Sequence, residues 1–75
     1  MQLSLHIDRA ADKSLQAQVT EQIRQLILDG RLVPGTRVPA SRTLAIDLAV
    51  SRNTVTGAYA QLQAEGLLET RDSAG

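Results

Sequence analysis

The sequence predicts one small, mainly α-helical domain of three helices, and three observations support this fold class. The chain has 75 residues, which is enough for a single domain with a small core. Because Tyr59 is the only aromatic residue, that core must consist of Leu, Ile, Val and Ala, a composition that favours helices. Apolar residues recur at helical spacing in three segments, which end near Gly30, Ala49 and Gly66.

Residues 1–13 are expected to form an extended N-terminal segment ahead of a domain that spans residues 14–75. Apolar residues at every second position of 3–7 are typical of a strand or an extended arm. The charged and small residues of 8–13 indicate a loop.

The first helix is expected to begin after Ser14, whose hydroxyl can cap it, and to end before Gly30, where a left-handed residue is needed. Its apolar residues share one face of a helical wheel and predict the side that packs on the core. These residues are Leu15, Val19, Ile23, Leu26 and Ile27.

The segment Val33 to Thr36 indicates a turn, because proline presets its second position and glycine tolerates the backbone of its third. A very short strand over 36–38 is expected to follow. A second helix over 41–49 then places Leu44 and Leu48 one turn apart.

The third helix is expected over about 51–65, with Ser51 as its cap and Gly66 at its end. Its inner face carries the apolar residues Val55, Ala58, Tyr59 and Leu62. Its outer face and flanks carry small or polar residues, namely Asn53, Thr54, Thr56, Gly57, Ala60 and Ala64. A strand over 67–71 and the start of a turn complete the chain.

Two short helices joined by about three residues predict a helix-turn-helix, in which the second helix enters the major groove of DNA. The residues from Ser51 to Thr54 place side-chain donors beside unpaired N–H groups, a combination that binds phosphate and reads bases. Arg52 could pair with guanine and Asn53 with adenine; the alternative is an ordinary capped helix start. Gly57 is either a tolerated surface glycine or a place where the helix approaches DNA closely.

Charge is unevenly distributed along the chain, although the net charge is zero. Residues 31–52 hold four arginines and one aspartate, a net charge of +3, whereas residues 1–30 carry −1 and residues 53–75 carry −2. Seven of the eight basic residues are arginine, which binds phosphates and guanine edges with a planar fork of donors. The middle third is the expected functional surface; on charge alone, a solvated surface would have the same composition.

Composition excludes several other classes of protein. The absence of cysteine excludes a disulfide scaffold and a cysteine-held zinc site. No apolar run approaches the ~20 residues of a membrane span and no signal-peptide pattern opens the chain, so we expect a soluble, cytoplasmic protein without a membrane partner. His6 is the only histidine and has no catalytic or ligand partner at a useful spacing, so neither an enzyme nor a metal site is expected.

A longer motif identifies the kind of domain. Residues 30–45 read Gly-Arg-Leu-Val-Pro-Gly-Thr-Arg-Val-Pro-Ala-Ser-Arg-Thr-Leu-Ala, and Val-Ser-Arg-Asn-Thr-Val follows at 50–55. With the Ala-Tyr pair and the Glu-Gly-Leu sequence beyond it, residues 14–71 strongly resemble the N-terminal winged helix-turn-helix domain of the GntR family of bacterial transcription regulators. The Ala-Tyr pair and the apolar segment before the first helix are more similar to the MocR subfamily.

The resemblance implies a three-helix winged helix-turn-helix that binds DNA at matching positions. Arg42 matches an arginine that contacts DNA in the family. Four residues match the start of the recognition helix, where base and phosphate contacts concentrate: Ser51, Arg52, Asn53 and Thr54. Thr56 stands where some relatives carry a basic residue, so its contact is expected to be weaker.

The resemblance also implies a small and incomplete β wing. Arg71 begins the stretch that matches the wing tip, but the chain stops before the return strand, so the strands over 36–38 and 67–70 are expected to pair poorly. Ala40 replaces a serine that is common in relatives, which leaves Ser41 as the expected cap of the second helix.

Beyond this chain, the resemblance implies a longer regulator that binds double-stranded DNA as a homodimer on paired half-sites. Family members join this domain to a C-terminal effector-binding or oligomerisation domain. In the MocR type that domain resembles a pyridoxal-phosphate aminotransferase, and nothing in these 75 residues could hold this cofactor. The alternative function is a protein-interaction module that has the winged-helix shape without binding DNA.

Overall fold

Three helices make up the described part of the chain. The computed structural model describes residues 5–33 and 38–68, and the helices are α1 (Leu15–Leu28), α2 (Ser41–Leu48) and α3 (Arg52–Ala64). Within those two ranges there is no strand. The prediction of a mainly α-helical domain with three helices is confirmed, while most of the two expected wing strands lies outside the described residues.

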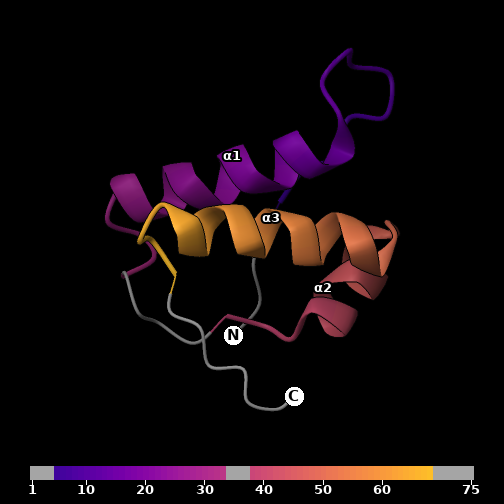
Figure 1. Ribbon diagram of the computed structural model, residues 1–75. Helices are drawn as coiled ribbons and strands as arrows, with labels where there is room; N and C mark the ends of the chain where they lie inside the picture. The colour runs from indigo at the N-terminus through magenta and orange to yellow at the C-terminus, as the bar shows by residue number, and fades with distance from the viewer. Residues whose placement is uncertain (1–4, 34–37, 69–75) are drawn as a thin grey trace.

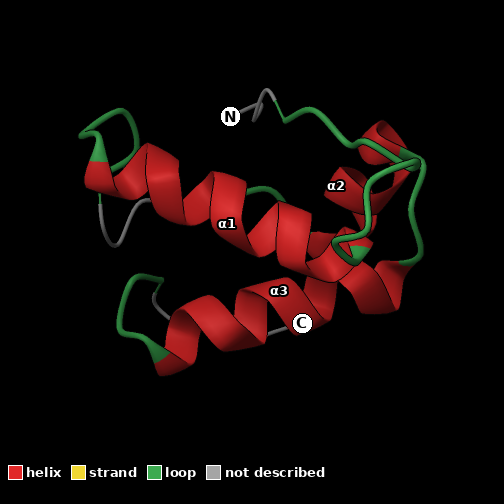
Figure 2. Ribbon diagram, turned by 90° about the horizontal axis from the view of Figure 1, so that it is seen from above, coloured by secondary structure: helices red, strands yellow, loops and turns green. Residues whose placement is uncertain are grey.

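Helix α3 is the central element. It contacts both α1 and α2, and it runs beside α1 in the same general direction (Figure 1). Seen from above, α2 lies beside the start of α3 (Figure 2). The connection between α2 and α3 is only Ala49 to Ser51, so the two helices form the compact pair that the spacing predicted.

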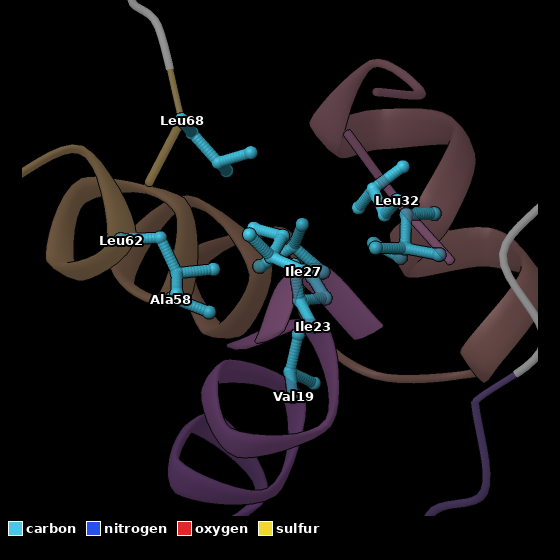
Figure 3. Packing of buried hydrophobic residues seen from close by; sticks show 10 residues of the cluster. Val19, Ile23, Ile27, Leu32, Ala58, Leu62 and Leu68 are labelled. Carbon is cyan, nitrogen blue, oxygen red and sulfur yellow. The ribbon is translucent and has the colours of Figure 1, made fainter. Parts of the chain in front are cut away.

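The hydrophobic core lies between α1 and α3. Val19, Ile23 and Ile27 of α1 face Ala58 and Leu62 of α3, as Figure 3 shows. The residues after each of these two helices close the core, and α2 adds two of its own side chains to it. The remaining buried members are Leu32, Leu44, Ala45, Val55 and Leu68.

Helices α1 and α3 begin and end on local signals. The Oγ atoms of Ser14 and Ser51 each accept a hydrogen bond of 3.1 Å from the backbone N–H three residues later. Gly30 and Gly66 follow these helices with φ of +82° and +79°, the left-handed conformation that glycine adopts without steric cost. These four expectations from the sequence are confirmed.

Helix α2 lacks both signals. Its N-cap is Ala40, whose side chain makes no capping hydrogen bond, and Ala49 beyond its last turn has φ of +57°. The prediction that Ser41 caps this helix is wrong, because Ser41 already has helical geometry. The last extended residue is Ala40, and its carbonyl accepts from the N–H of Leu44 at 3.0 Å. The left-handed Ala49 was not expected, since an L-residue in this conformation costs roughly 1–2 kcal/mol.

Candidate nucleic-acid interface

At the start of α3, two side chains are bonded to each other and two others are exposed without a bond between them. Ser51 Oγ accepts from the N–H of Thr54 and lies 2.9 Å from Thr54 Oγ1, so these two side chains form the helix cap. Arg52 and Asn53, between them in sequence, are exposed in the first turn. The cap thus fixes the backbone, and the guanidinium and amide groups remain accessible to a partner.

The outer surface of α3 is small and polar. It consists of the exposed residues Arg52, Asn53, Thr56, Ala60 and Ala64. Opposite it, Val55, Ala58 and Leu62 are completely buried, which confirms the predicted inner face at these three positions. Because Thr56 and Ala60 are small, the middle of this surface could let the helix backbone come close to a groove floor, with the half-buried Gln63 farther along.

Gly57 does not belong to the outer surface. A Cβ atom at this position would lie 2.6 Å from Cδ of Gln16, so the residue faces α1 and leaves room for the Gln16 side chain. Both interpretations made from the sequence had placed Gly57 on the surface. The atoms that a Cβ would meet all belong to the side-chain amide of Gln16, so the glycine here lies against α1.

The start of α2 presents the second candidate contact. Arg42 is exposed in the first turn of this helix. No side chain caps this turn, so its first backbone N–H groups have no acceptor from residue 40. This pairing of an arginine with an uncapped helix start suits a phosphate oxygen.

Tyr59 fixes this start of α2 to α3. Its hydroxyl donates a 2.8 Å hydrogen bond to the carbonyl oxygen of Pro39, the residue before the N-cap. Burial raises the pKa of Tyr59 to about 12, so the phenol remains a donor at neutral pH. Tyr59 packs against the core, as predicted, and acts as a link between the two helices that carry Arg42 and Arg52.

The acidic end of α3 is turned toward α1. Arg24 donates to both carboxylate oxygens of Glu65, from Nε at 2.9 Å and from Nη2 at 2.6 Å. This hydrogen bonding, with a further bond from Gln61, lowers the pKa of Glu65 to about 2. Glu65 is therefore paired beside α1, and its charge does not extend along the outer surface of α3.

One contact near this interface has no precursor in the local sequence pattern. Arg9 donates from Nη2 to the carbonyl oxygen of Ala49, forty positions away, and to that of Leu48 at 3.4 Å. Because the residues are distant in sequence, only the three-dimensional fold reveals the pairing. Arg71, the predicted wing residue, lies outside the described residues.

Other kinds of site were sought in the described ranges 5–33 and 38–68. This part of the chain has no group of three or more His, Cys, Asp or Glu residues that could hold a metal ion. Nor does it contain a helix with the length and apolar character needed to cross a membrane. The exposed residues of α2 and α3 remain the best candidate site.

Comparison with known proteins agrees with this geometry. The sequence profile described as bacterial regulatory proteins, gntR family, matches residues 15–75. A solved structure of YtrA from Sulfolobus acidocaldarius, a GntR-family transcription factor, superposes with a TM-score of 0.78 and 39% sequence identity, over 83% of this chain and 66% of that one.

Two curated relatives show how the domain is used at different lengths. The probable rhizopine catabolism regulatory protein MocR of Rhizobium meliloti is 48% identical over 71 residues, which are 95% of this chain and 14% of that protein. The transcriptional repressor YtrA of Bacillus subtilis is 35% identical over 66 residues, 88% of this chain and 51% of that protein. The chain thus spans about one seventh of the first relative and half of the second.

Proposed function

Because the chain belongs to the GntR family of bacterial regulatory proteins, it is a helix-turn-helix DNA-binding domain of a transcription regulator, and we propose that it reads its operator with the outer surface of α3. The observation that carries this proposal is the exposure of Arg52 and Asn53 in the first turn of a helix that exposes the small residues Thr56 and Ala60 in its next two turns. The matches to transcription regulators give no support to the alternative of an interaction module without DNA.

Each candidate residue takes a role that its surroundings allow. Arg52 forks onto O6 and N7 of a guanine, and Asn53 pairs with an adenine edge. Arg42 binds a backbone phosphate beside the uncapped start of α2. Ser51 and Thr54 hold the helix start and offer hydroxyls to the nearest phosphate, and Thr56 adds a weak contact farther along. Arg71 contacts DNA from the wing.

The rest of the regulator is proposed from its relatives. We infer that the full protein is a cytoplasmic homodimer that binds paired half-sites, and that it is of the MocR type. The 48% identity to the Rhizobium meliloti protein supports that subfamily. In such a regulator, pyridoxal phosphate would belong to a C-terminal domain and not to these residues. A single domain is then expected to bind weakly, because it lacks the second, linked contact.

A salt titration of DNA binding tests the function directly. Duplexes selected from a random pool by the 75-residue chain would be titrated at several salt concentrations, with fluorescence anisotropy of the labelled DNA as the readout. About four phosphate contacts per domain predict a slope near −3 to −4 for log affinity against log salt. A shallow slope without sequence preference would contradict DNA recognition.

Two arginine variants separate base reading from phosphate binding. Arg52→Ala should weaken binding to the selected duplex by roughly 1–3 kcal/mol and relax its sequence preference. Arg42→Ala should weaken binding to all duplexes alike and reduce the salt slope by about 1. Lys13→Ala is the matched control, because it also removes one positive charge but from a residue paired with Glu21 at 2.7 Å. Unchanged affinity in both arginine variants would refute the docking.

A further inference from the structure

The N-terminal arm, residues 5–13, is attached to α1 by a ladder of side-chain amides. The N–H of His6 donates to Oε1 of Gln22 at 2.8 Å, and Nε2 of Gln22 donates back to the carbonyl of His6. Gln18 repeats this exchange with Asp8, at 2.8 and 2.9 Å. Each glutamine amide thus replaces a peptide group of a neighbouring strand.

The spacing of the two glutamines explains why the ladder fits. Four residues along a helix rise about 6 Å, and two residues along an extended chain rise about 6.6 Å. Gln18 and Gln22 are therefore in register with Asp8 and His6, and the arm runs antiparallel to α1. The alternating apolar residues of the arm, Leu5 and Ile7, pack against the core.

The same anchoring fixes the position of Arg9. Asp8 Oδ1 accepts from the N–H of Ala10 at 3.0 Å, which forms a tight turn around Arg9. Nε2 of Gln18 also donates to the carbonyl of Lys13 at 3.0 Å, so one buried amide holds both ends of the loop. Arg9 therefore extends from a fixed base.

Arg9 reaches the turn that joins α2 to α3. Its guanidinium donates to the carbonyls of Leu48 and Ala49, at the end of α2 where the helix leaves acceptors without partners. Ala49 has the left-handed φ of +57°, and the N–H of Val50 bonds back to Ala45 at 3.0 Å. The guanidinium of Arg9 thus supplies donors to carbonyl oxygens at this turn.

We propose that Arg9 is a positioning residue for DNA binding, which holds the turn between α2 and α3 and so fixes the relative placement of Arg42 and Arg52. The inference rests on the proposed function, because the effect on DNA passes through these two arginines. Arg9 touches no base in this account. It acts by keeping the two helix starts at the separation that one stretch of duplex requires.

Affinity measured at several salt concentrations tests this role. The selected duplex would be titrated with the 75-residue chain, with its Arg9→Ala and Arg9→Lys variants and with the control Lys13→Ala. Each titration would be run at a temperature well below the thermal unfolding midpoint of that protein. Arg9→Ala is expected to raise Kd about fivefold to tenfold with an unchanged salt slope, and Arg9→Lys should recover most of the loss. Lys13→Ala should stay within about twofold of the parent chain.

Two results would overturn the proposal. Folded Arg9→Ala with a Kd within about twofold of the parent would show that the turn needs no support. A salt slope reduced by about 0.9 would make Arg9 a phosphate contact instead of a positioning residue.

A measurement without DNA separates this inference from the proposed function. Hydrogen exchange of the Val50 N–H should become about tenfold faster in Arg9→Ala, while that of Ile23 in α1 stays unchanged. Unchanged exchange at Val50 would refute the positioning role even if the chain binds DNA well. Failure of the parent chain to bind any duplex would instead refute the proposed function.

Discussion

The α1–α3 pair and α2 are stabilised in different ways. Both long helices carry a serine cap at the start and a left-handed glycine at the end, and their core faces are buried against each other. Helix α2 has eight residues, no side-chain cap and an alanine in the left-handed position. Its ends are instead held from outside, by Tyr59 at Pro39 and by Arg9 at Ala49.

This difference indicates which part of the domain is rigid and which part depends on its neighbours. An eight-residue helix without caps is marginal by itself, because nucleation is costly and few hydrogen bonds repay it. Its position is therefore set by contacts from α3 and from the N-terminal arm. Since Arg42 lies on α2 and Arg52 on α3, the relative placement of these two exposed arginines depends on those contacts.

The largest expected effect comes from opening the core between α1 and α3. Leu62→Ala should lower the free energy of unfolding by about 2–5 kcal/mol, a large share of the total for a domain of this size. Leu44→Ala on α2 should lie at the lower end of that range. Of the two other helices, α2 contacts only α3, so it can move to fill part of the cavity that the shorter side chain leaves. Urea denaturation followed by circular dichroism measures both, and a larger loss at Leu44 would contradict the comparison.

Changes at the caps should come next and have opposite signs. Ser51→Ala removes the hydroxyl that accepts from Thr54 and should destabilise the domain by about 1 kcal/mol. Ala40→Ser supplies the missing cap of α2 and should stabilise the domain by a similar amount. Ala60→Ser, at an exposed position inside α3, is the control for adding a hydroxyl. Thermal unfolding would show midpoints shifted in opposite directions. An unchanged midpoint for Ala40→Ser would show that a side-chain cap does not stabilise the start of α2.

Alkaline pH tests the link between α2 and α3. Burial raises the pKa of Tyr59 from 10.0 to about 12, so folding opposes ionisation of the phenol. The stability that this group contributes is complete below pH 10 and is lost as pH rises from 10 to about 12. Tyr59→Phe removes the hydrogen bond to Pro39 and should lower the free energy of unfolding by about 0.5–1.5 kcal/mol at neutral pH. The variant should also lose less stability between pH 10 and about 12. Parallel pH profiles for both chains would contradict this.

Acid pH tests the α1–α3 pair and should give the smallest effect. Hydrogen bonds from Arg24 and Gln61 lower the pKa of Glu65 from 4.5 to about 2, so its contribution is complete above pH 4.5 and is lost as pH falls toward 2. Glu65→Gln should remove this part of the acid dependence, and Arg24→Gln should reduce it. The change is expected to be small because the ion pair is accessible to solvent. Denaturation profiles that fall in parallel would exclude the pair as a source.

Local signals in the sequence were enough to predict most of the fold. A serine before each long helix, a glycine after it and apolar residues at helical spacing gave α1 and α3 almost residue by residue. The exposed residues Arg52 and Asn53 were also placed correctly, because their positions follow from the period of α3 once Ser51 is identified as its cap.

Features that depend on distant contacts could not be predicted in this way. Gly57 faces Gln16 on another helix, and the buried Gln18 is satisfied by the arm. The left-handed Ala49 has no local signature, since alanine usually favours a continuing helix. In each case the deciding partner lies outside the helix that carries the residue.

Tyr59 is the only aromatic residue of the chain, and it links α3 to the segment just before α2. Its ultraviolet emission therefore arises from a single known location, without background from tryptophan or phenylalanine. The natural fluorophore would report rearrangement of the helix-turn-helix during duplex binding, in real time and without an attached dye.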